Sequence, residues 1–294
     1  MKVGVQFGIA RSARLTAPLA TLFIVALWGL VLVWPTFAGA AGAGAAAGSD
    51  AARSRSDQRQ SGKAFLSDDL RRQQEDPAAS PVGLWLERGQ AAWGQADDPK
   101  ACAACHGALR PGQTLATAAA RYPRLDPQSN RLINLEDQIH ACRNRSGRAH
   151  AQPEDEEVLA LSAWLHAQAR DRPIDVQPPT EDKARAAWAE ALERGAQAYG
   201  QRMGRMNLAC VHCHDQRVGR QLRAEVISPG HPTGFPVYRL RWQTLGSLER
   251  RLRACFSGVQ AEVPAPGDSL LRDLELFLKV RAQGMPVEGP SVRR

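Results

Sequence analysis

The chain has 294 residues, and its 38 basic and 30 acidic residues give it a formal net charge of +8. This length is enough for about two domains of ordinary size. The basic residues are interspersed with acidic ones and no nucleic-acid motif accompanies them, so the charge does not indicate nucleic-acid binding. We expect the charge to keep the surface solvated; docking of an acidic partner is the alternative.

The N-terminus has the plan of an export signal. The first 49 residues contain no acidic residue, and an apolar run of 18 residues extends from Ala17 to Trp34. Ala38-Gly39-Ala40 then offers an A-x-A cleavage site. We therefore expect residues 1–40 to be a cleaved signal peptide and the rest to work in the periplasm, with a charge of +5 after three basic residues are lost. Since the run is nearly long enough to span a bilayer, an uncleaved N-terminal anchor is the alternative.

Residues 41–80 are rich in small and polar residues, and we expect a spacer with one short helix around residues 65–72. Beyond it the chain repeats itself. The string Leu-Glu-Arg-Gly at residues 86–89 recurs at residues 192–195. A module of about one hundred residues has the size of a small domain, so the repeat predicts domains at residues 81–178 and 179–294.

Each copy also contains a lone cysteine, Cys142 or Cys255, and the copies stay in register around it. A Leu-Glu pair begins seven residues before each cysteine, and an aromatic residue, Trp164 or Phe277, lies 22 residues after it. A shared register over this span indicates an internal duplication.

The modules are predicted to be helical. Pro153 followed by four acidic residues favours a helix start with proline at the first position. The matching helix of the second copy should begin near Asp268 and stop at Gly284. No run shows sustained two-residue alternation, so the predicted fold class is all-α, with two similar domains in tandem.

Each copy carries one C-x-x-C-H motif. The two thiols of such a motif add to the haem vinyl groups, and the histidine reaches under the ring as the proximal iron ligand. A structural zinc site is the alternative, and three disulfides would be the first expectation for six cysteines in an exported protein. The spacing favours two covalently bound haem c groups, one on Cys102, Cys105 and His106 and one on Cys210, Cys213 and His214.

No methionine lies between Met1 and Met203, so the first haem has no methionine ligand from its own module. The sixth position of the first iron is then either left without a protein ligand or filled by one cysteine or one of three histidines: Cys142, His140, His150 or His166. Only Cys142 has a counterpart in register, Cys255. We therefore expect thiolate ligation of both irons, which lowers the reduction potential. A disulfide between the two cysteines is the alternative, and Met285 is a rival ligand for the second haem.

Cys255 follows a run of arginines. If the segment is helical, Arg251 shares the face of Cys255, because residues four apart are neighbours on a helix. A guanidinium lowers the pKa of a nearby thiol and offers a fork to an oxyanion. Arg250 is expected on a solvated face.

The sequence resembles the SoxA family, the dihaem cytochrome c subunits of the bacterial thiosulfate-oxidising Sox system. The tandem C-x-x-C-H modules with lone cysteines carry the resemblance over roughly residues 80–294. Its most specific blocks are residues 235–240, 251–255, 274–278, 284–287 and 292–294.

The resemblance implies an L-cysteine S-thiosulfotransferase. Such a subunit pairs with a small monohaem cytochrome, SoxX, and oxidatively joins thiosulfate to a cysteine of the carrier SoxYZ; a soluble cytochrome c takes the electrons. It implies that Cys255 is the catalytic cysteine, ligates the second haem and can exist as a persulfide. It further implies that Arg251 binds substrate and that Cys142 ligates the first haem.

The main alternative function is a dihaem electron-transfer cytochrome without a substrate of its own. That protein needs no open pocket at Cys255. A dihaem peroxidase would need an iron with an accessible sixth position, which two thiolate-ligated haems do not readily supply.

Overall fold

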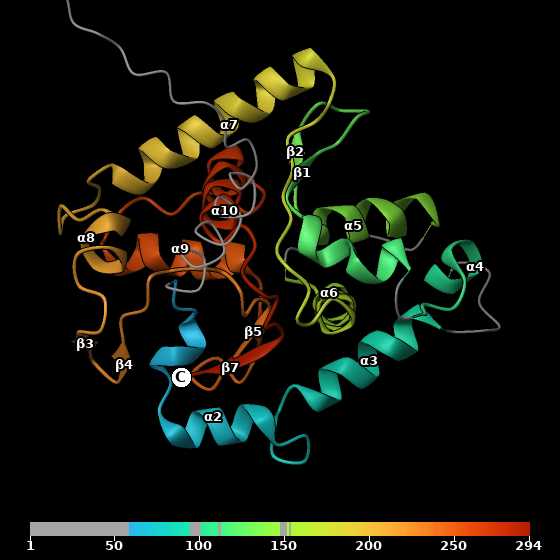
Figure 1. Cartoon of the computed structure of the whole chain (residues 1–294), viewed down its shortest axis with the longest axis horizontal. Coiled ribbons are helices and arrows are strands. Elements are labelled where there is room, and N and C mark those ends of the chain that lie inside the picture. Colours follow the sequence, from blue (N-terminus) through green and yellow to red (C-terminus); the bar gives the residue numbers. More distant parts are fainter. Residues whose placement is uncertain (1–58, 95–100, 111–112, 148–151, 153) are drawn as a thin grey trace, which may run out of the picture. The chain divides into compact units, whose positions relative to one another are not determined.

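The computed structural model describes residues 59–94, 101–110, 113–147, 152 and 154–294 (Figure 1). The expected signal peptide, residues 41–58 of the expected spacer, His150 and Pro153 lie outside this part. The chain divides into two compact units, Met1–Gly44 and Ala45–Arg294, and every described residue belongs to the second. Within the described ranges, no helix has the length and apolar content needed to cross a membrane.

The described part is mainly helical, and two 3₁₀ helices, η1 (Gly62–Phe65) and η2 (Thr114–Arg121), accompany the α-helices. The α-helices are α2 (Asp68–Glu75), α3 (Gly83–Trp93), α4 (Cys102–His106), α5 (Leu135–Arg145), α6 (Glu156–Gln168), α7 (Asp182–Gly200), α8 (Cys210–His214), α9 (Leu248–Gly258) and α10 (Ser269–Arg281).

Short strands modify the all-α expectation. A β1–β2 pair and a β3–β4 pair are antiparallel hairpins, and a third sheet has the order β6–β5–β7. In this sheet β7 runs parallel to β5 and brings the C-terminal tail beside residues 237–239. The strands have only two or three residues, too few to show an alternating pattern in sequence. They are β1 (Arg124–Leu125), β2 (Leu132–Ile133), β3 (Gln221–Leu222), β4 (Glu225–Val226), β5 (Val237–Arg239), β6 (Thr244–Gly246) and β7 (Ser291–Arg293).

The predicted boundaries of three helices need correction. Helix α6 begins at Glu156 with Asp155 as its N-cap, later than the proline suggested. Glu154 cannot belong to the helix, because its φ is +67° and its carboxylate accepts hydrogen bonds from Ser247. Helix α10 does begin after Asp268, which caps it, but ends at Arg281 rather than at Gly284. The helix expected around residues 65–72 forms as α2, three residues later.

The repeated glycines sit where helices cross. Helix α3 packs on α6 and α7 packs on α10, as Figure 1 shows. A Cβ on Gly89 would lie 2.2 Å from the Ala160 carbonyl oxygen, and a Cβ on Gly195 would lie 2.1 Å from the Asp273 carbonyl oxygen. Each glycine also faces the aromatic residue that the register paired, Trp164 or Phe277. The close approach explains why both helices carry glycine in their interior, where it otherwise costs stability.

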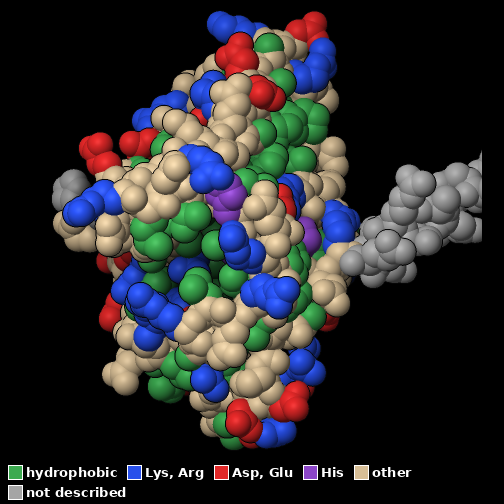
Figure 2. Space-filling model, turned by 90° about the vertical axis from the view of Figure 1, so that its left-hand side faces the viewer, with side chains coloured by type: hydrophobic (Ala, Val, Ile, Leu, Met, Phe, Trp, Pro, Cys, Tyr) green, Lys and Arg blue, Asp and Glu red, His purple; other side chains and the backbone are tan. Residues whose placement is uncertain are grey.

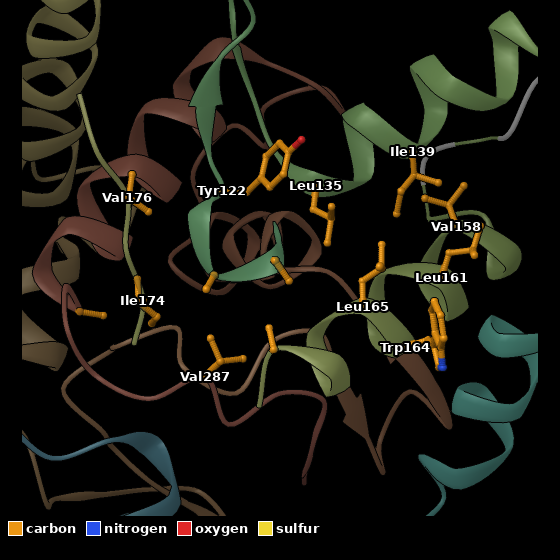
Figure 3. Close-up of a cluster of buried hydrophobic side chains, with 14 of the residues drawn as sticks. Tyr122, Leu135, Ile139, Val158, Leu161, Trp164, Leu165, Ile174, Val176 and Val287 are labelled. Carbon is orange, nitrogen blue, oxygen red and sulfur yellow. The ribbon is translucent and has the colours of Figure 1, made fainter. Parts of the chain in front are cut away.

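The larger hydrophobic core lies among α3, α5, α6 and the segments that follow α6 and α10 (Figure 3). Leu161, Ile174 and Val287 are each at most 2% exposed. Figure 3 shows Val287, near the C-terminal end of the sequence, in the same core as Tyr122 and Ile174. Met285 also belongs to this core and is 5% exposed. Its side chain therefore packs against the apolar residues of this core.

Buried polar contacts connect the first set of helices (α3–α6) to the second (α7–α10). Arg272 of α10 donates to both carboxylate oxygens of Asp137, one at 2.7 Å, and to Glu249. Asn134 donates to Glu275 at 3.2 Å. These contacts bring α5 and α9, the helices that carry the lone cysteines, to the same buried Arg272.

Candidate functional site

The first C-x-x-C-H motif forms α4. The helix ends at Gly107, whose φ of +70° favours glycine. Trp93 fixes this end: its Nε1 donates to the Gly107 carbonyl at 3.1 Å, and its ring stacks on His106 with centroids 5.7 Å apart. A single turn of helix thus presents Cys102, Cys105 and His106 together, as covalent haem attachment requires.

Cys142 lies on α5 with two donors at its sulfur. Gln138 Nε2 donates to Sγ at 3.3 Å and Arg145 Nη2 donates at 3.1 Å. Burial raises the pKa of Cys102, and the nearby Cys142 raises it further, so the lone cysteine lies near the first motif. Donors around the sulfur stabilise the thiolate, which is the form that ligates metals. The sequence did not single out Arg145, because it lies three residues after the cysteine.

The second motif forms α8, and its histidine is firmly oriented. His214 Nδ1 donates to the Ser228 carbonyl at 2.7 Å. This hydrogen bond leaves Nε2 free to ligate a metal, because it fixes the tautomer of the ring. Burial lowers the pKa of His214, although the Ser228 bond opposes this effect and the positive charges of Arg251 and Arg281 add to it. The neutral ring is the form that ligates iron.

Cys255 lies on α9 and faces the second motif. Burial raises the pKa of Cys210 to about 11, and the charge of Cys255 is the next largest cause. Helix α9 starts at Leu248, capped by the Ser247 hydroxyl, which accepts from the Arg250 amide at 3.0 Å. The segment is therefore helical, and Arg251 and Cys255, which are four residues apart, lie on the same face of the helix.

The three arginines of α9 have different surroundings. Arg250 lies over the Trp242 ring at 4.4 Å and donates to the Leu245 carbonyl at 3.3 Å, and its side chain is 34% exposed, so it is only partly solvated. Arg253 Nε donates to the Pro264 carbonyl at 3.0 Å. Arg251 alone of the three makes no ion pair and no side-chain hydrogen bond with the described residues. Its guanidinium is therefore available to an anion.

Buried nitrogens near the second motif also lack acceptors. Arg239 Nε and Arg281 Nη1 find no hydrogen-bond partner in the described part of the chain. Burial and then the charge of Arg251 lower the pKa of Arg239, which indicates that the two guanidinium groups are close. Unpaired buried donors are costly, so an anionic group is expected beside them. Haem carries two propionates, and the residues present fit a haem c.

The alternative metal and cysteine arrangements find no support. All six cysteines are described and none forms a disulfide. The described residues contain no group of three or more side chains arranged for a metal such as zinc. His166 does not face the first motif: it is buried, and its Nδ1 bonds to the Ser162 carbonyl at 2.8 Å. Burial, and then Lys279, lower the pKa of His166 to about 3.

A buried ionic cluster between α6 and α10 was not predicted from the sequence. Glu275 and Lys279 of α10 are each 5% exposed and line a small cavity with His166 and Glu136. Burial raises the pKa of Glu275 to about 7 and lowers the pKa of Lys279. Each residue alone resembles an ordinary surface charge, so no sequence signal identified the cluster.

The surface beside α8 is basic. Figure 2 views the side on which α8, β3 and β4 lie in Figure 1, and shows Lys and Arg side chains around a hollow with hydrophobic walls and a histidine. Exposed apolar side chains, Leu222 of β3 and Val226 of β4, are 58% and 41% exposed. This combination of positive charge and exposed apolar area is suited to docking of another molecule.

Comparison with known proteins agrees with this geometry. Residues 88–174 match the family model described as the SoxA/TsdA cytochrome c domain. The protein is thus a c-type cytochrome. The protein named L-cysteine S-thiosulfotransferase subunit SoxA of Pseudaminobacter salicylatoxidans is 32% identical over 80% of each chain, and that of Rhodovulum sulfidophilum is 31% identical over 81% of this chain and 82% of its own. The chain belongs to the SoxA family.

A solved structure gives the same result. The crystal structure of SoxXA from P. pantotrophus matches with a TM-score of 0.72 and 28% identity, over 80% of this chain and 87% of that chain. The predicted family, the cytochrome c character and the mainly helical fold are therefore confirmed. The names of the relatives also agree with the predicted enzyme class.

Proposed function

We propose that this chain is the dihaem subunit of a periplasmic L-cysteine S-thiosulfotransferase, which joins thiosulfate to the carrier cysteine of a SoxYZ-like protein. The single observation that carries the assignment is Arg251. It lies one helical turn before Cys255. The guanidinium groups of Arg250 and Arg253 bond to backbone carbonyls, whereas that of Arg251 has no hydrogen-bond partner among the described residues.

In this mechanism Arg251 binds the sulfonate end of thiosulfate through its planar fork. The outer sulfur of thiosulfate is thereby directed at Cys255, because the two side chains share a helix face. Arg239, whose guanidinium is close to that of Arg251, adds positive charge for the dianion. The Ser228 carbonyl holds His214 in one orientation throughout.

Coupling a carrier thiol to thiosulfate forms one sulfur–sulfur bond and releases one proton and two electrons. A haem c held by His214 and Cys255 would supply a one-electron acceptor beside the reacting sulfur. We assign one haem c to Cys102, Cys105, His106 and Cys142, and one to Cys210, Cys213, His214 and Cys255. Transfer of the sulfur unit to the carrier follows thiol–disulfide exchange, in which a thiolate attacks a sulfur–sulfur bond.

The partners follow from the same assignment. A SoxX-like monohaem cytochrome forms the heterodimer, an assembly supported by the likeness of this chain to the SoxXA crystal structure, and a soluble cytochrome c removes the electrons. The basic face beside α8 suits an acidic carrier. Export to the periplasm is supported by the acid-free N-terminus and its apolar run.

We further infer that residues 81–178 and 179–294 are duplicated cytochrome c domains. The equivalent crossings of α3 on α6 and α7 on α10, each at a glycine, support the duplication. So does the isolated bridge between Pro173 and Pro286, which lie 31 residues after Cys142 and Cys255 respectively.

Intact mass and electron paramagnetic resonance of the purified protein test this proposal. We expect the mass of two haems, a further sulfur on Cys255, and two low-spin ferric species with His/thiolate ligation. Thiosulfate should reduce an electron acceptor only when the SoxX-like partner and the carrier are present. Spectra with only His/Met or His/His species would refute the ligand assignment, and turnover unchanged in Cys255→Ala would refute the catalytic one.

A further inference from the structure

The segment that precedes α2 contacts the second set of helices, far from it in sequence. Arg59 donates to the carbonyls of Arg281 and Gln283, both at 2.7 Å. The Gln60 carbonyl accepts from His231 Nδ1 at 2.9 Å. Residues 59–61, expected in the spacer, are therefore attached to the end of α10 and to the loop at residues 228–233.

That loop holds the proximal histidine of the second motif. Its Ser228 carbonyl accepts the His214 Nδ1 hydrogen bond at 2.7 Å. Gly230, with φ of +75°, lies against the imidazole so closely that a Cβ there would be 3.1 Å from ring atoms Cγ and Nδ1. A displacement of the loop would consequently move or release the His214 ring.

A carboxylate connects the N-terminal segment to the same loop. Ser61 Oγ donates to Glu288 Oε1 at 2.7 Å, and Thr233 Oγ1 donates to Glu288 Oε2 at 2.7 Å. Thr233 is only 2% exposed. Because Thr233 and Glu288 are 55 residues apart, this bridge depends on tertiary structure. It fixes the end of the loop opposite Ser228.

Arg59 supports the other side of the histidine. The Arg281 whose carbonyl it binds donates through Nη2 to Asp215 at 2.7 Å, and Asp215 directly follows His214. Two chains of contacts thus run from residues 59–61 to the residues around His214. By contrast, no ring hydrogen bond of His106 is present in the described part of the chain; that histidine is stacked on Trp93.

We propose that residues 59–61 are a positioning element for His214: by holding the loop at residues 228–233 and the end of α10, they keep the imidazole in the orientation required by the second haem. This inference rests on the second haem of the proposed function. A histidine that donates its second ring nitrogen is a more basic ligand, and partners of this kind tune the metal that it binds. Loosening the loop weakens that donation and makes the second haem easier to reduce.

The test compares two serines of the same segment in the full-length holoprotein. Ser61→Ala removes the hydrogen bond to Glu288. Ser67→Ala is the matched control, since it removes only the bond to the Leu70 amide at the start of α2. Arg59→Ala is compared with Arg72→Ala in the same way. Among the described residues the Arg72 guanidinium pairs only with Asp69, on the exposed side of α2. Ser61→Thr retains a hydroxyl and should restore the parent behaviour.

We expect Ser61→Ala and Arg59→Ala each to raise the midpoint potential of the second haem and to change its paramagnetic resonance spectrum. The first haem, measured in the same molecule, should not change. Hydrogen exchange at the amides of residues 228–234 should become faster. The double variant should show a larger shift than either single variant.

The inference is overturned if both single variants leave the second haem unchanged, or if both haems shift equally, which would indicate general destabilisation. A shift as large in Ser67→Ala would also overturn it. These outcomes do not depend on thiosulfate turnover. If the protein carries only one haem, the proposed function fails instead, and the haem count by mass identifies that case.

Discussion

Replacing Arg251 by alanine should separate substrate binding from haem ligation. Arg251 makes no ion pair or side-chain hydrogen bond within the described residues, so its removal leaves no protein group unpaired and should change stability by no more than about 0.5 kcal/mol. A hydrogen bond to a charged group contributes about 1.5–3 kcal/mol. Because about 1.4 kcal/mol corresponds to a factor of ten, kcat/KM for thiosulfate should fall by about ten- to a hundredfold.

The assay is thiosulfate-dependent reduction of an electron acceptor in the presence of the SoxX-like partner and the carrier protein. Arg251→Lys keeps the charge but loses the planar fork, so an intermediate rate is expected. The ferric haem spectrum should remain nearly that of the parent, because Arg251 is not a ligand.

The control must be chosen from the structure. Arg250→Ala is unsuitable, because it removes a cation–π contact with Trp242, an interaction of about 0.5–1 kcal/mol at an exposed site. Arg172 is exposed and its described contacts are those of its backbone. Arg172→Ala should therefore leave turnover unchanged. Equal rates for Arg251→Ala and Arg172→Ala would refute the role of Arg251 in substrate binding.

Three further predictions follow from other parts of the structure. Cys142→Ala should disturb the paramagnetic resonance of the first haem while sparing most thiosulfate turnover; a loss as complete as in Cys255→Ala would contradict this division. His166→Gln should reduce the loss of stability on acidification. The buried ring has a pKa of about 3, whereas unfolding exposes a histidine with a pKa of about 6.5. The free energy of unfolding of the parent protein should therefore fall by up to about 1.4 kcal/mol per pH unit as the pH drops from about 6.5 toward 3. Urea unfolding between pH 4 and 7 measures the free energy of unfolding of both proteins. An equal dependence on pH in parent and variant would argue against the buried neutral ring. Gly195→Ala should lower the free energy of unfolding by about 1–3 kcal/mol or more, because the new Cβ would overlap the α10 backbone. Gly200→Ala is the control: its Cβ would meet nothing within 4 Å, so the variant should be neutral or stabilising in the same thermal unfolding measurement.

The sequence by itself determined the features that depend on short, fixed spacings. Two C-x-x-C-H motifs are local, since covalent attachment and histidine ligation need only one turn of helix. The register of the lone cysteines followed from equal intervals along the chain. Helix α10 was predicted near Asp268 from the matching helix of the first copy and from leucines that recur on one face, a pattern that also spans only a few residues.

Only the tertiary structure decided what each polar side chain contacts. Three arginines of one helix are equivalent in sequence, but Trp242 engages Arg250, the Pro264 carbonyl engages Arg253, and Arg251 remains available. Helix α6 also starts later than the sequence predicts. Glu154, which was expected in the helix, instead accepts a hydrogen bond from Ser247, 93 residues away. The contacts of residues 59–61 extend over more than 150 residues. Hydrogen bonds and ion pairs act only over a few ångströms, so the partner of a side chain is fixed by folding and is not encoded in its immediate neighbours.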